Sequence, residues 1–231
     1  MAESTLAIFD LDGTITRHDT LWPFISGLLA RHPRRWWRLS LCLAPFARYF
    51  LGNHDRGALK GALIRATLGG LPRATLEHWA RSFTERLLAG GLYAEALTCI
   101  AAHRRAHARL VLLSASPDLY VPLIATALGF DECVCTEVRW RADGTLEGTL
   151  ASANRRGAEK TRCVRALLAQ WQPLLSHAYG NSRADLGHLE LVSAGSYVNG
   201  PDRDVVDLPS VRAVHWSSGA PVDAAARMAD L

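Results

Sequence analysis

Short apolar runs separated by longer mixed stretches make up the pattern of this chain. Apolar runs of a few residues, bounded by polar or glycine-containing segments, are typical of strands buried in a parallel sheet. The pattern predicts such strands at 6–9, 110–113, 133–140 and 176–179, with shorter ones at 196–198 and 211–216. Asp143 and Gly144 favour a turn into residues 145–150, which predicts a hairpin after the third strand.

Helical stretches lie between these strands. The pattern predicts helices within 18–90, where glycines make breaks, and at 94–108, 117–128, 157–170 and 185–192. Strands that alternate with helices indicate an α/β fold with a doubly wound, Rossmann-like parallel sheet. Ligands of such folds bind beyond the carboxyl ends of the strands. Asp10, Ser114 and Asn181 each follow a predicted strand, so we expect their loops to converge.

Composition and charge narrow the class of protein. The 231 residues suit one large α/β domain or a core with a small insertion. With 49% hydrophobic and 21% charged residues, the chain is globular rather than disordered. The net charge of +4 favours an anionic substrate and is too small to indicate a nucleic-acid partner, so we expect none. Only Lys60 and Lys160 are lysines among the 26 basic residues.

Cysteine usage and hydropathy bear on the compartment. The five cysteines are an odd number without a CxxC pair, and we expect them to be reduced, which implies a cytoplasmic protein. The first residues do not resemble a signal peptide. No apolar run reaches the roughly 18 residues of a membrane span. Residues 36–51 come nearest, but Arg38, Pro45 and Arg48 interrupt them.

Two aspartates flank a single residue directly after the first predicted strand. Asp10 and Asp12 would repel each other, and a divalent cation would relieve that repulsion. One carboxylate facing phosphorus can act as nucleophile while the other protonates the leaving oxygen. Gly13 and Thr14 would offer backbone amides and a hydroxyl to phosphate oxygens. The alternatives are a polar turn with an aspartate helix cap, or a calcium loop.

Later positions would complete a phosphate and metal site. Ser114 would add a hydroxyl and the free amides of a helix start, although serine is also a common helix cap. Lys160 can reach a phosphate and screen the carboxylates, and a lysine in this arginine-rich chain suggests that a compact charge is needed. The alternative for Lys160 is a solvated surface residue. Asn181 and Asp185 would place two oxygen ligands on one loop, or form an asparagine turn with an aspartate cap.

The order of these motifs, DxDGT, Ser, Lys and GNSxxD, resembles the haloacid dehalogenase superfamily of phosphohydrolases over residues 8–192. The resemblance implies a phosphomonoesterase with an aspartyl-phosphate intermediate. Asp10 would be the nucleophile, and Asp12 would be the general acid and then the base. Ser114, with the amide of Ala115, and Lys160 would bind the phosphoryl group. An aspartate at position 12 favours a phosphatase over a dehalogenase.

The same resemblance implies a Mg²⁺ cofactor. The Asp10 carboxylate, the Asp12 carbonyl and the Asn181 side chain would hold the ion, with Asp185 beside it or bound to it. The family's last motif usually opens with aspartate, and here it opens with Asn181. An amide oxygen can ligate magnesium but lacks the negative charge, so metal affinity should fall unless Asp185 compensates. A catalytically weak phosphate-binding protein is therefore an alternative.

An all-helical insertion between the first two motifs is similar to that of phosphoserine phosphatase and its relatives, subfamily IB. It implies a helical cap inserted after the first strand. The chain would divide into a phosphohydrolase core of residues 1–17 and 91–231 and a cap domain of residues 18–90. Asp19 lies where phosphoserine phosphatases carry a carboxylate for the substrate ammonium, which implies phosphoserine or histidinol phosphate as substrate. The alternative for Asp19 is a first-turn residue of the cap helix.

The segment from Arg31 to Arg56 indicates a different substrate. It contains six arginines, one acidic residue, Trp36 and Trp37, and several large apolar residues. Such a composition suits a helix on an anionic membrane surface. A similar layout occurs in the phosphatidylglycerophosphatase C family, which implies a lipid phosphate substrate and peripheral contact with the inner membrane. The alternative is a cap that packs its own apolar face and leaves its arginines solvated.

Overall fold

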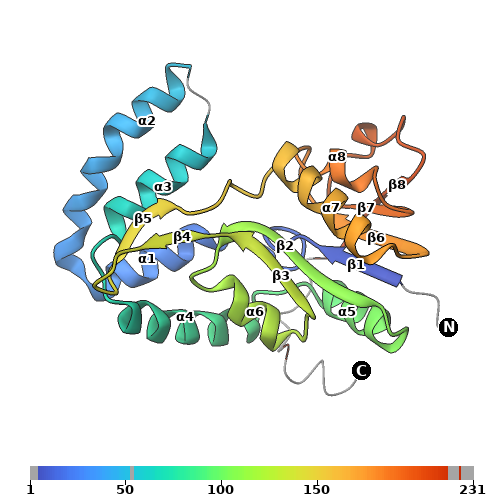
Figure 1. The fold of residues 1–231 in the computed structure, drawn as a ribbon, viewed down its shortest axis with the longest axis horizontal. Helices are drawn as coiled ribbons and strands as arrows, with labels where there is room; N and C mark the ends of the chain where they lie inside the picture. The colour runs from blue at the N-terminus through green and yellow to red at the C-terminus, as the bar shows by residue number, and fades with distance from the viewer. Residues whose placement is uncertain (1–4, 53–54, 218–223, 225–231) are drawn as a thin grey trace.

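The computed structural model describes residues 5–52, 55–217 and 224 of the chain. Its centre is a six-stranded parallel sheet in the order β3-β2-β1-β6-β7-β8 (Figure 1). The strands are β1 (Thr5–Phe9), β2 (Arg109–Pro117), β3 (Glu132–Thr136), β6 (Leu175–Gly180), β7 (Ala194–Val198) and β8 (Val211–Val214). The chain moves outward from β1 in both directions, which confirms the predicted doubly wound α/β fold.

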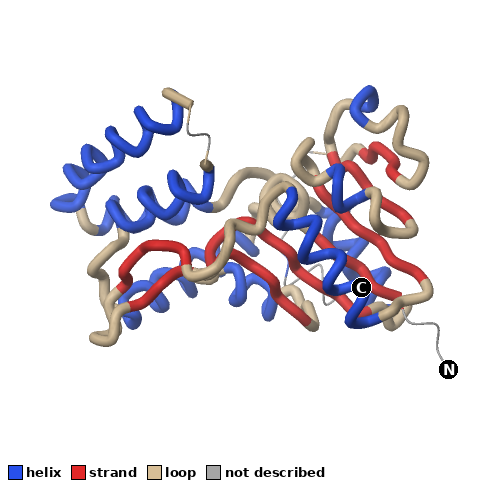
Figure 2. The backbone as a smooth tube through the Cα atoms, turned by 45° about the horizontal axis from the view of Figure 1, so that its top comes forward, coloured by secondary structure: helices blue, strands red, loops and turns tan. Residues whose placement is uncertain are grey.

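Helices cover both faces of this sheet (Figure 2). Successive side chains of a strand point to opposite faces, so neighbouring residues of β1 enter different clusters. Phe9 packs in a cluster with α5 (Ala94–Arg105) and α6 (Val121–Ala127). Ile8 packs in a second cluster with α7 (Ala158–Trp171) and α8 (Leu186–Leu189). Burial of β1 on both faces explains its uninterrupted apolar sequence.

Between the loop that follows β1 and the start of α5, the described residues are mostly helical, which confirms the helical insertion after the first strand. They form α1 (Leu21–Arg31), the 3₁₀ segment η1 (Pro33–Cys42), α2 (Leu43–Phe50), α3 (Arg56–Thr67) and α4 (Arg73–Leu88). Phe24 of α1 contacts Trp79 and Phe83 of α4 through their rings, and all three belong to the cluster of Phe9. By contrast, α2 has no buried residue and lies at the outer edge of the molecule (Figure 1).

The prediction of one strand over 133–140 is wrong. β3 belongs to the main sheet, whereas β4 (Val138–Trp140) pairs antiparallel with β5 (Leu146–Leu150) in a separate two-stranded sheet. The predicted hairpin is thus confirmed. It packs against α3 through β5 and forms a bridge between Thr145 and Pro72. An alternating pattern indicates extended chain without showing which strand each residue pairs with, and the sequence therefore merged two strands.

The end of β2 and the start of α6 also differ from the prediction. β2 continues through Ser114 to Pro117, and α6 begins at Val121. Pro117 is in register with Thr136 of β3, and the Asp118 amide donates to the Thr136 carbonyl at 2.9 Å. Pairing with β3 therefore outweighs the preference of a Pro-Asp sequence for a helix start.

The remaining helices agree with the prediction in part. α5 and α7 begin within one residue of the expected positions, whereas α8 spans only four residues of the predicted 185–192. Throughout the described ranges, the structure has no helix long and apolar enough to cross a membrane.

Candidate active site

The carboxyl ends of β1, β2 and β6 meet the start of α7 at one edge of the sheet, and a cavity of about 180 Å³ opens there. Its wall consists of Asp10, Asp12, Asp19, Leu21, Arg56, Lys60, Ala115, Ser116, Asn154, Arg156, Lys160, Asn181, Ser182 and Asp185. Seven of the ten residues that the sequence assigned to the site are in this wall. The three others, Gly13, Thr14 and Ser114, lie behind it.

Asp10, Lys160 and Asp185 form a buried ion triad. The Lys160 ammonium donates to Asp10 Oδ1 at 2.7 Å and to Asp185 Oδ1 at 2.8 Å, and all three side chains are less than a tenth exposed. Lys160 lies in the first turn of α7, whose cap residue Gly157 has a φ of +59°, a conformation that favours glycine. The backbone before α7 therefore turns so that this lysine enters the cavity rather than the solvent.

The two carboxyls of the triad differ in their pKa. Burial raises the pKa of Asp10 to about 7, with further upward contributions from Asp185 and Asp12, and Lys160 opposes the rise. Burial also acts upward on Asp185, but Lys160, His188 and the bonds from Ser182 outweigh it and hold the pKa of that carboxyl well below its usual range. Asp185 therefore keeps the negative charge that balances Lys160, and Asp10 is the more basic carboxylate.

Asp12 is held in the same cavity wall by hydroxyl and amide donors. Its Oδ1 accepts from the Thr20 amide at 2.7 Å and from the Thr20 hydroxyl at 2.6 Å. Its Oδ2 accepts from the Ser116 hydroxyl at 2.5 Å. Burial raises the pKa of Asp12, Asp19 adds to the rise, and the bonds from Ser116 and Thr20 oppose it. A raised pKa is the direction that favours a carboxyl group as a proton donor.

The structure places Ser114 and Ser116 differently. Ser114 is fully buried, and its Oγ accepts from the Ser116 amide at 3.0 Å. Ser116 and Ala115 are in the cavity wall, and Ser116 reaches Asp12. Sequence reasoning missed Ser116, although its position between Ser114 and Pro117 near a strand end was a signal. The continuation of β2 beyond residue 113 is what brings Ser116 to the cavity.

Gly13 and Thr14 shape the loop behind the cavity. Gly13 has a φ of +76°, and a Cβ there would lie 2.0 Å from Asn181 Nδ2, so only glycine lets the two loops approach this closely. The buried Thr14 hydroxyl donates to Asp10 Oδ2 at 3.2 Å. Thr14 therefore orients Asp10, and Gly13 makes room for the Asn181 side chain.

The oxygen donors at this edge fit a hard divalent cation. No cluster of three His, Cys, Asp or Glu side chains suited to a metal occurs among the described residues, and the predicted donor set differs from such a cluster because it includes an amide and a carbonyl. Asp10, Asn181 and Asp185 present side-chain oxygen atoms to the cavity, and oxygen is the ligand atom that Mg²⁺ prefers. The wall also has four carboxylates and four cationic side chains, a formal charge of zero. A phosphate dianion and a divalent cation entering together would preserve that balance.

Lys60 reaches the same cavity from α3 and was missed by sequence reasoning. Its ammonium donates to the Ala115 carbonyl at 2.6 Å and to Asn154 Oδ1 at 2.7 Å. Burial lowers the pKa of Lys60 to about 8, while Asp12 and Asp19 act in the opposite direction. The available signal was the scarcity of lysine: both lysines of the chain lie in one cavity wall.

Asp19 fits both interpretations that the sequence left open, a residue of the substrate site and a residue at the start of the first helix. It lines the cavity, and its Oδ1 accepts from the Leu21 amide at 2.9 Å at the start of α1. The side chain is exposed, unlike Asp10 and Asp185. It therefore lies at the rim of the cavity, where a polar group of a bound ligand could reach it.

The sequence is similar to one protein family and to named proteins of two bacteria. A model of the haloacid dehalogenase-like hydrolase family matches residues 7–190. Protein CicA of Caulobacter vibrioides is 32% identical over 195 residues, which cover 84% of this chain and 86% of CicA. A protein of Mycobacterium tuberculosis that is named as a probable phosphatase is 29% identical over 90% of this chain and 73% of its own length.

Solved structures share the fold at lower sequence identity. A Bordetella pertussis protein of unknown function has a TM-score of 0.75 at 22% identity, covering 92% of this chain and 98% of its own. A phosphoserine phosphatase in its apo form has a TM-score of 0.64 at 13% identity, covering 92% and 94%. At these identities the likeness shows a common fold.

Proposed function

This chain belongs to the haloacid dehalogenase-like hydrolase family, and we propose that it is a Mg²⁺-dependent phosphomonoesterase that forms an aspartyl-phosphate on Asp10. The observation that supports this most directly is the buried triad of Asp10, Lys160 and Asp185, with Asp12 in the same cavity wall. The phosphatase name of the Mycobacterium relative agrees with it.

In the first step, a carboxylate oxygen of Asp10 attacks the substrate phosphorus. A bond forms between that oxygen and phosphorus, and the bond from phosphorus to the ester oxygen breaks. Asp12 gives its proton to the leaving oxygen, which departs as an alcohol. Lys160 holds one oxygen of Asp10 at 2.7 Å and Thr14 donates to the other, so the nucleophile is oriented before the substrate binds.

In the second step, Asp12 takes a proton from a water molecule, and the water oxygen attacks the phosphorus. The bond to Asp10 breaks, and inorganic phosphate leaves with the carboxylate restored. When bound, Mg²⁺ would offset the charge that develops on the phosphoryl oxygens. Asp10, the Asp12 carbonyl, Asn181 and Asp185 would hold it.

The other predicted residues take supporting roles in this proposal. The Ala115 amide would face the phosphoryl oxygens, as the family resemblance implies, and the Gly13 amide would do so as part of the loop after β1. Ser114 would act from behind the wall through its bond with the Ser116 amide, unless a bound phosphoryl group draws its hydroxyl forward. We also propose that residues 18–90 form the cap domain, and the β4–β5 hairpin would then pack with that cap because β5 lies on α3.

Turnover of p-nitrophenyl phosphate tests this function. We expect hydrolysis with Mg²⁺, loss of activity with EDTA, and recovery when Mg²⁺ is restored in excess. If Mg²⁺, Mn²⁺ and Co²⁺ all fail to support turnover while inorganic phosphate still binds, the protein is the phosphate-binding alternative, with Asn181 as the weak point of its metal site.

For the substrate class, we propose a lipid phosphate presented at an anionic membrane surface. Large apolar side chains of η1, α2 and the residue after α2 are exposed; they are Trp36, Trp37, Leu41, Leu43, Phe46, Phe50 and Leu51. Trp37 is 66% exposed and Phe50 75%. Exposed apolar residues gathered in one segment are typical of an interaction surface. This segment, residues 36–51, is called the apolar cap surface below.

Basic residues accompany the apolar cap surface. Arg34 and Arg48 are exposed, Arg35 and Arg38 are partly buried, and no acidic residue occurs between Asp19 and residue 53. Tryptophan and arginine around exposed leucine and phenylalanine suit the interface between headgroups and acyl chains of an anionic bilayer. The cap helices precede and include α3, which supplies Lys60 to the catalytic cavity. Membrane contact would thus occur on the same domain that covers the site.

A small amino-bearing phosphate is the second candidate, because Asp19 lies at the cavity rim. One experiment distinguishes the two candidate substrate classes. It measures turnover of phosphoserine, histidinol phosphate and phosphatidylglycerophosphate by the wild type and by Asp19→Ala. The lipid proposal expects the fastest turnover on the lipid, and binding to anionic vesicles that weakens in high salt. It fails if phosphoserine is cleaved fastest and Asp19→Ala loses that preference.

A further inference from the structure

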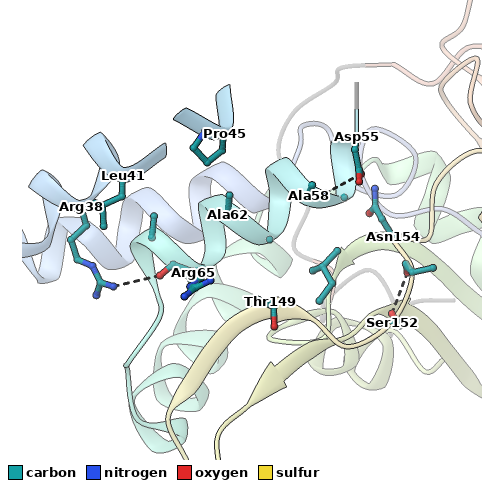
Figure 3. A pocket seen from close by; sticks show the side chains of 15 residues that line it. Arg38, Leu41, Pro45, Asp55, Ala58, Ala62, Arg65, Thr149, Ser152 and Asn154 are labelled. Atoms are coloured by element: carbon teal, nitrogen blue, oxygen red, sulfur yellow. Dashed lines mark hydrogen bonds between the residues drawn. The ribbon is translucent and has the colours of Figure 1, made fainter. Parts of the chain in front are cut away.

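A groove much larger than the catalytic cavity runs along one face of α3. Its volume is about 790 Å³, within the range of ligand-binding pockets. η1 and α2 form one wall, β5 and residues 152–154 form the other, and α3 forms the floor (Figure 3). We call it the α3 groove. It spans α3 from residue 55 to residue 66, roughly 16 Å at the rise of an α-helix.

Its floor is apolar because α3 has small residues on this face. Gly57, Ala58, Gly61, Ala62 and Ala66 line the groove, and they recur at helical spacing. Leu41 and Leu150 line the walls. Gly61 and Ala66 are buried, and Leu150 lies against Gly61, whereas Ala58 is exposed and Ala62 is partly exposed. The open part of this apolar floor is therefore at Ala58 and Ala62.

The α3 groove adjoins the catalytic cavity at Asn154. Asn154 lines both, and its Oδ1 accepts from Lys60 of the catalytic wall at 2.7 Å. On α3 itself, Arg56 and Lys60 line the catalytic cavity while their neighbours Gly57 and Gly61 line the groove. One helix thus presents cations to the catalytic cavity and an apolar face to the groove, in adjacent rows.

We propose that the α3 groove holds the alkyl or acyl chain of the phosphorylated substrate while its phosphate group is at Asp10. This inference rests on the proposed phosphatase function and specifies how that site would select an amphiphilic substrate. Each methylene that leaves water for the groove strengthens binding by up to about fourfold. Chain length, and not the membrane alone, then determines the preference among phosphomonoesters.

The charged residues of the groove are compatible with an apolar occupant. At the end away from Asn154, the Arg38 guanidinium donates to the Gly69 carbonyl at 2.9 Å and to the Arg65 carbonyl. At the end near Asn154, Asp55 accepts from the Ala58 amide at 3.0 Å as the cap of α3 (Figure 3). Arg38 and Asp55 thus bond to backbone at the two ends, and the third charged residue of the lining, Arg65, is exposed. The other α3 residues of the lining are glycine and alanine.

The test compares soluble alkyl phosphates below their micelle concentrations, so that no membrane surface is present. Butyl and octyl phosphate are each assayed for phosphate release and for binding by calorimetry, with p-nitrophenyl phosphate as the head-group reference. We expect kcat/KM and affinity to rise at least about tenfold from butyl to octyl phosphate. Ala58→Phe and Ala62→Phe fill the groove and should remove that rise.

A matched control separates filling from general disturbance. Ala74→Phe introduces the same side chain at an exposed position of α4, outside the groove, and should keep the full chain-length dependence. All three variants should hydrolyse p-nitrophenyl phosphate at the wild-type rate, because this substrate has no chain for the groove. Equal rates also show that the variants are folded.

Two results would overturn the inference. Wild type could bind octyl and butyl phosphate equally, or Ala58→Phe and Ala62→Phe could retain the preference for octyl phosphate. Binding by calorimetry does not require turnover, so the groove is tested even if the enzyme hydrolyses nothing. Conversely, good turnover of p-nitrophenyl phosphate without chain-length dependence leaves the phosphatase function intact and removes only the groove.

Discussion

The sheet edge with the candidate active site, called the catalytic edge below, and the apolar cap surface distribute charged and apolar groups in opposite ways. At the catalytic edge, Lys160, Asp10 and Asp185 are almost fully buried and bonded to one another. In the apolar cap surface, Trp37 and Phe50 are mostly exposed and contribute little to the protein's own core. In globular proteins the usual arrangement is the reverse, with charges outside and large apolar groups inside.

The two regions also differ in how strongly their groups depend on one another. Each buried charge at the catalytic edge has a bonded partner, and removing one partner from such a pair typically destabilises by about 3–5 kcal/mol. The exposed apolar groups of the cap have no such interdependence. Single substitutions should therefore have large and specific effects at the catalytic edge and small, additive ones in the cap.

The largest expected effect is that of Asp10→Asn. The amide cannot attack phosphorus, so turnover of p-nitrophenyl phosphate should fall below detection. Asp185 still balances Lys160, so the variant should fold, which thermal melting followed by circular dichroism would check. Asp143→Asn, in the exposed turn of the hairpin, is the matched control and should keep full activity. Substantial turnover by Asp10→Asn would remove it as nucleophile.

Asp12→Asn comes next, because it removes proton transfer and leaves the nucleophile in place. General acid and base help is typically worth about 10²- to 10⁴-fold. The loss should be greater for an alkyl phosphate than for p-nitrophenyl phosphate, whose leaving group departs without a proton. Comparison of kcat on the two esters measures this. An equal loss on both would assign Asp12 a role other than that of the acid.

Lys60 extends the comparison to a residue of the helical insertion whose ammonium lies in the cavity wall. We expect the Lys60 ammonium to donate to the substrate phosphate, because it lines the cavity. Lys60→Met should therefore raise KM about tenfold or more, since a hydrogen bond to a charged group contributes about 1.5–3 kcal/mol. Burial lowers the pKa of Lys60 to about 8, so the wild-type ammonium is lost as the pH rises through 8, and KM should rise there.

Lys60→Arg provides the control for this pH dependence. Arginine stays protonated throughout the accessible range, so the step in KM near pH 8 should disappear while KM at neutral pH stays lower than in Lys60→Met. If the step persists in Lys60→Arg, a group other than Lys60 causes it.

Asn181→Asp should have a smaller effect, and in the favourable direction. A charged oxygen replaces an amide oxygen, so the Mg²⁺ concentration for half-maximal activity should fall severalfold. Titration of activity with Mg²⁺ measures the change. An unchanged Mg²⁺ requirement would show that Asn181 is not a ligand, in spite of its place in the cavity wall.

The smallest effect on stability and basal turnover is expected in the cap. The double variant Trp37→Gln/Phe50→Gln should lose binding to anionic vesicles but keep p-nitrophenyl phosphate turnover. Because both side chains are exposed, its free energy of unfolding should change by no more than about 0.5 kcal/mol for each substitution. Phe24→Ala, in the core, should lose about 3–5 kcal/mol. Unchanged vesicle binding would show that the apolar cap surface is not a membrane-binding surface.

Much of the fold followed from local patterns. Burial of β1 on both faces produces the run that predicted it, and the alternation of strands with helices predicted the doubly wound sheet. The hairpin followed from its Asp-Gly turn. Strand ends were less predictable, because the extension of β2 to Pro117 depends on pairing with β3 rather than on its own sequence.

The sequence by itself determined the candidate catalytic motif and its order, because Asp10, Asp12 and Lys160 are placed by a strand end, a tight turn and a helix start, all of which are local. Only the tertiary structure decided that Lys60 meets Ala115, 55 residues away, and that Ser116 faces the cavity while Ser114 is buried. It also decided that α3 and β5 enclose a groove. These outcomes depend on which segments distant in sequence pack together. The periodicity of a segment shows which of its faces is buried but does not show which other segment covers that face.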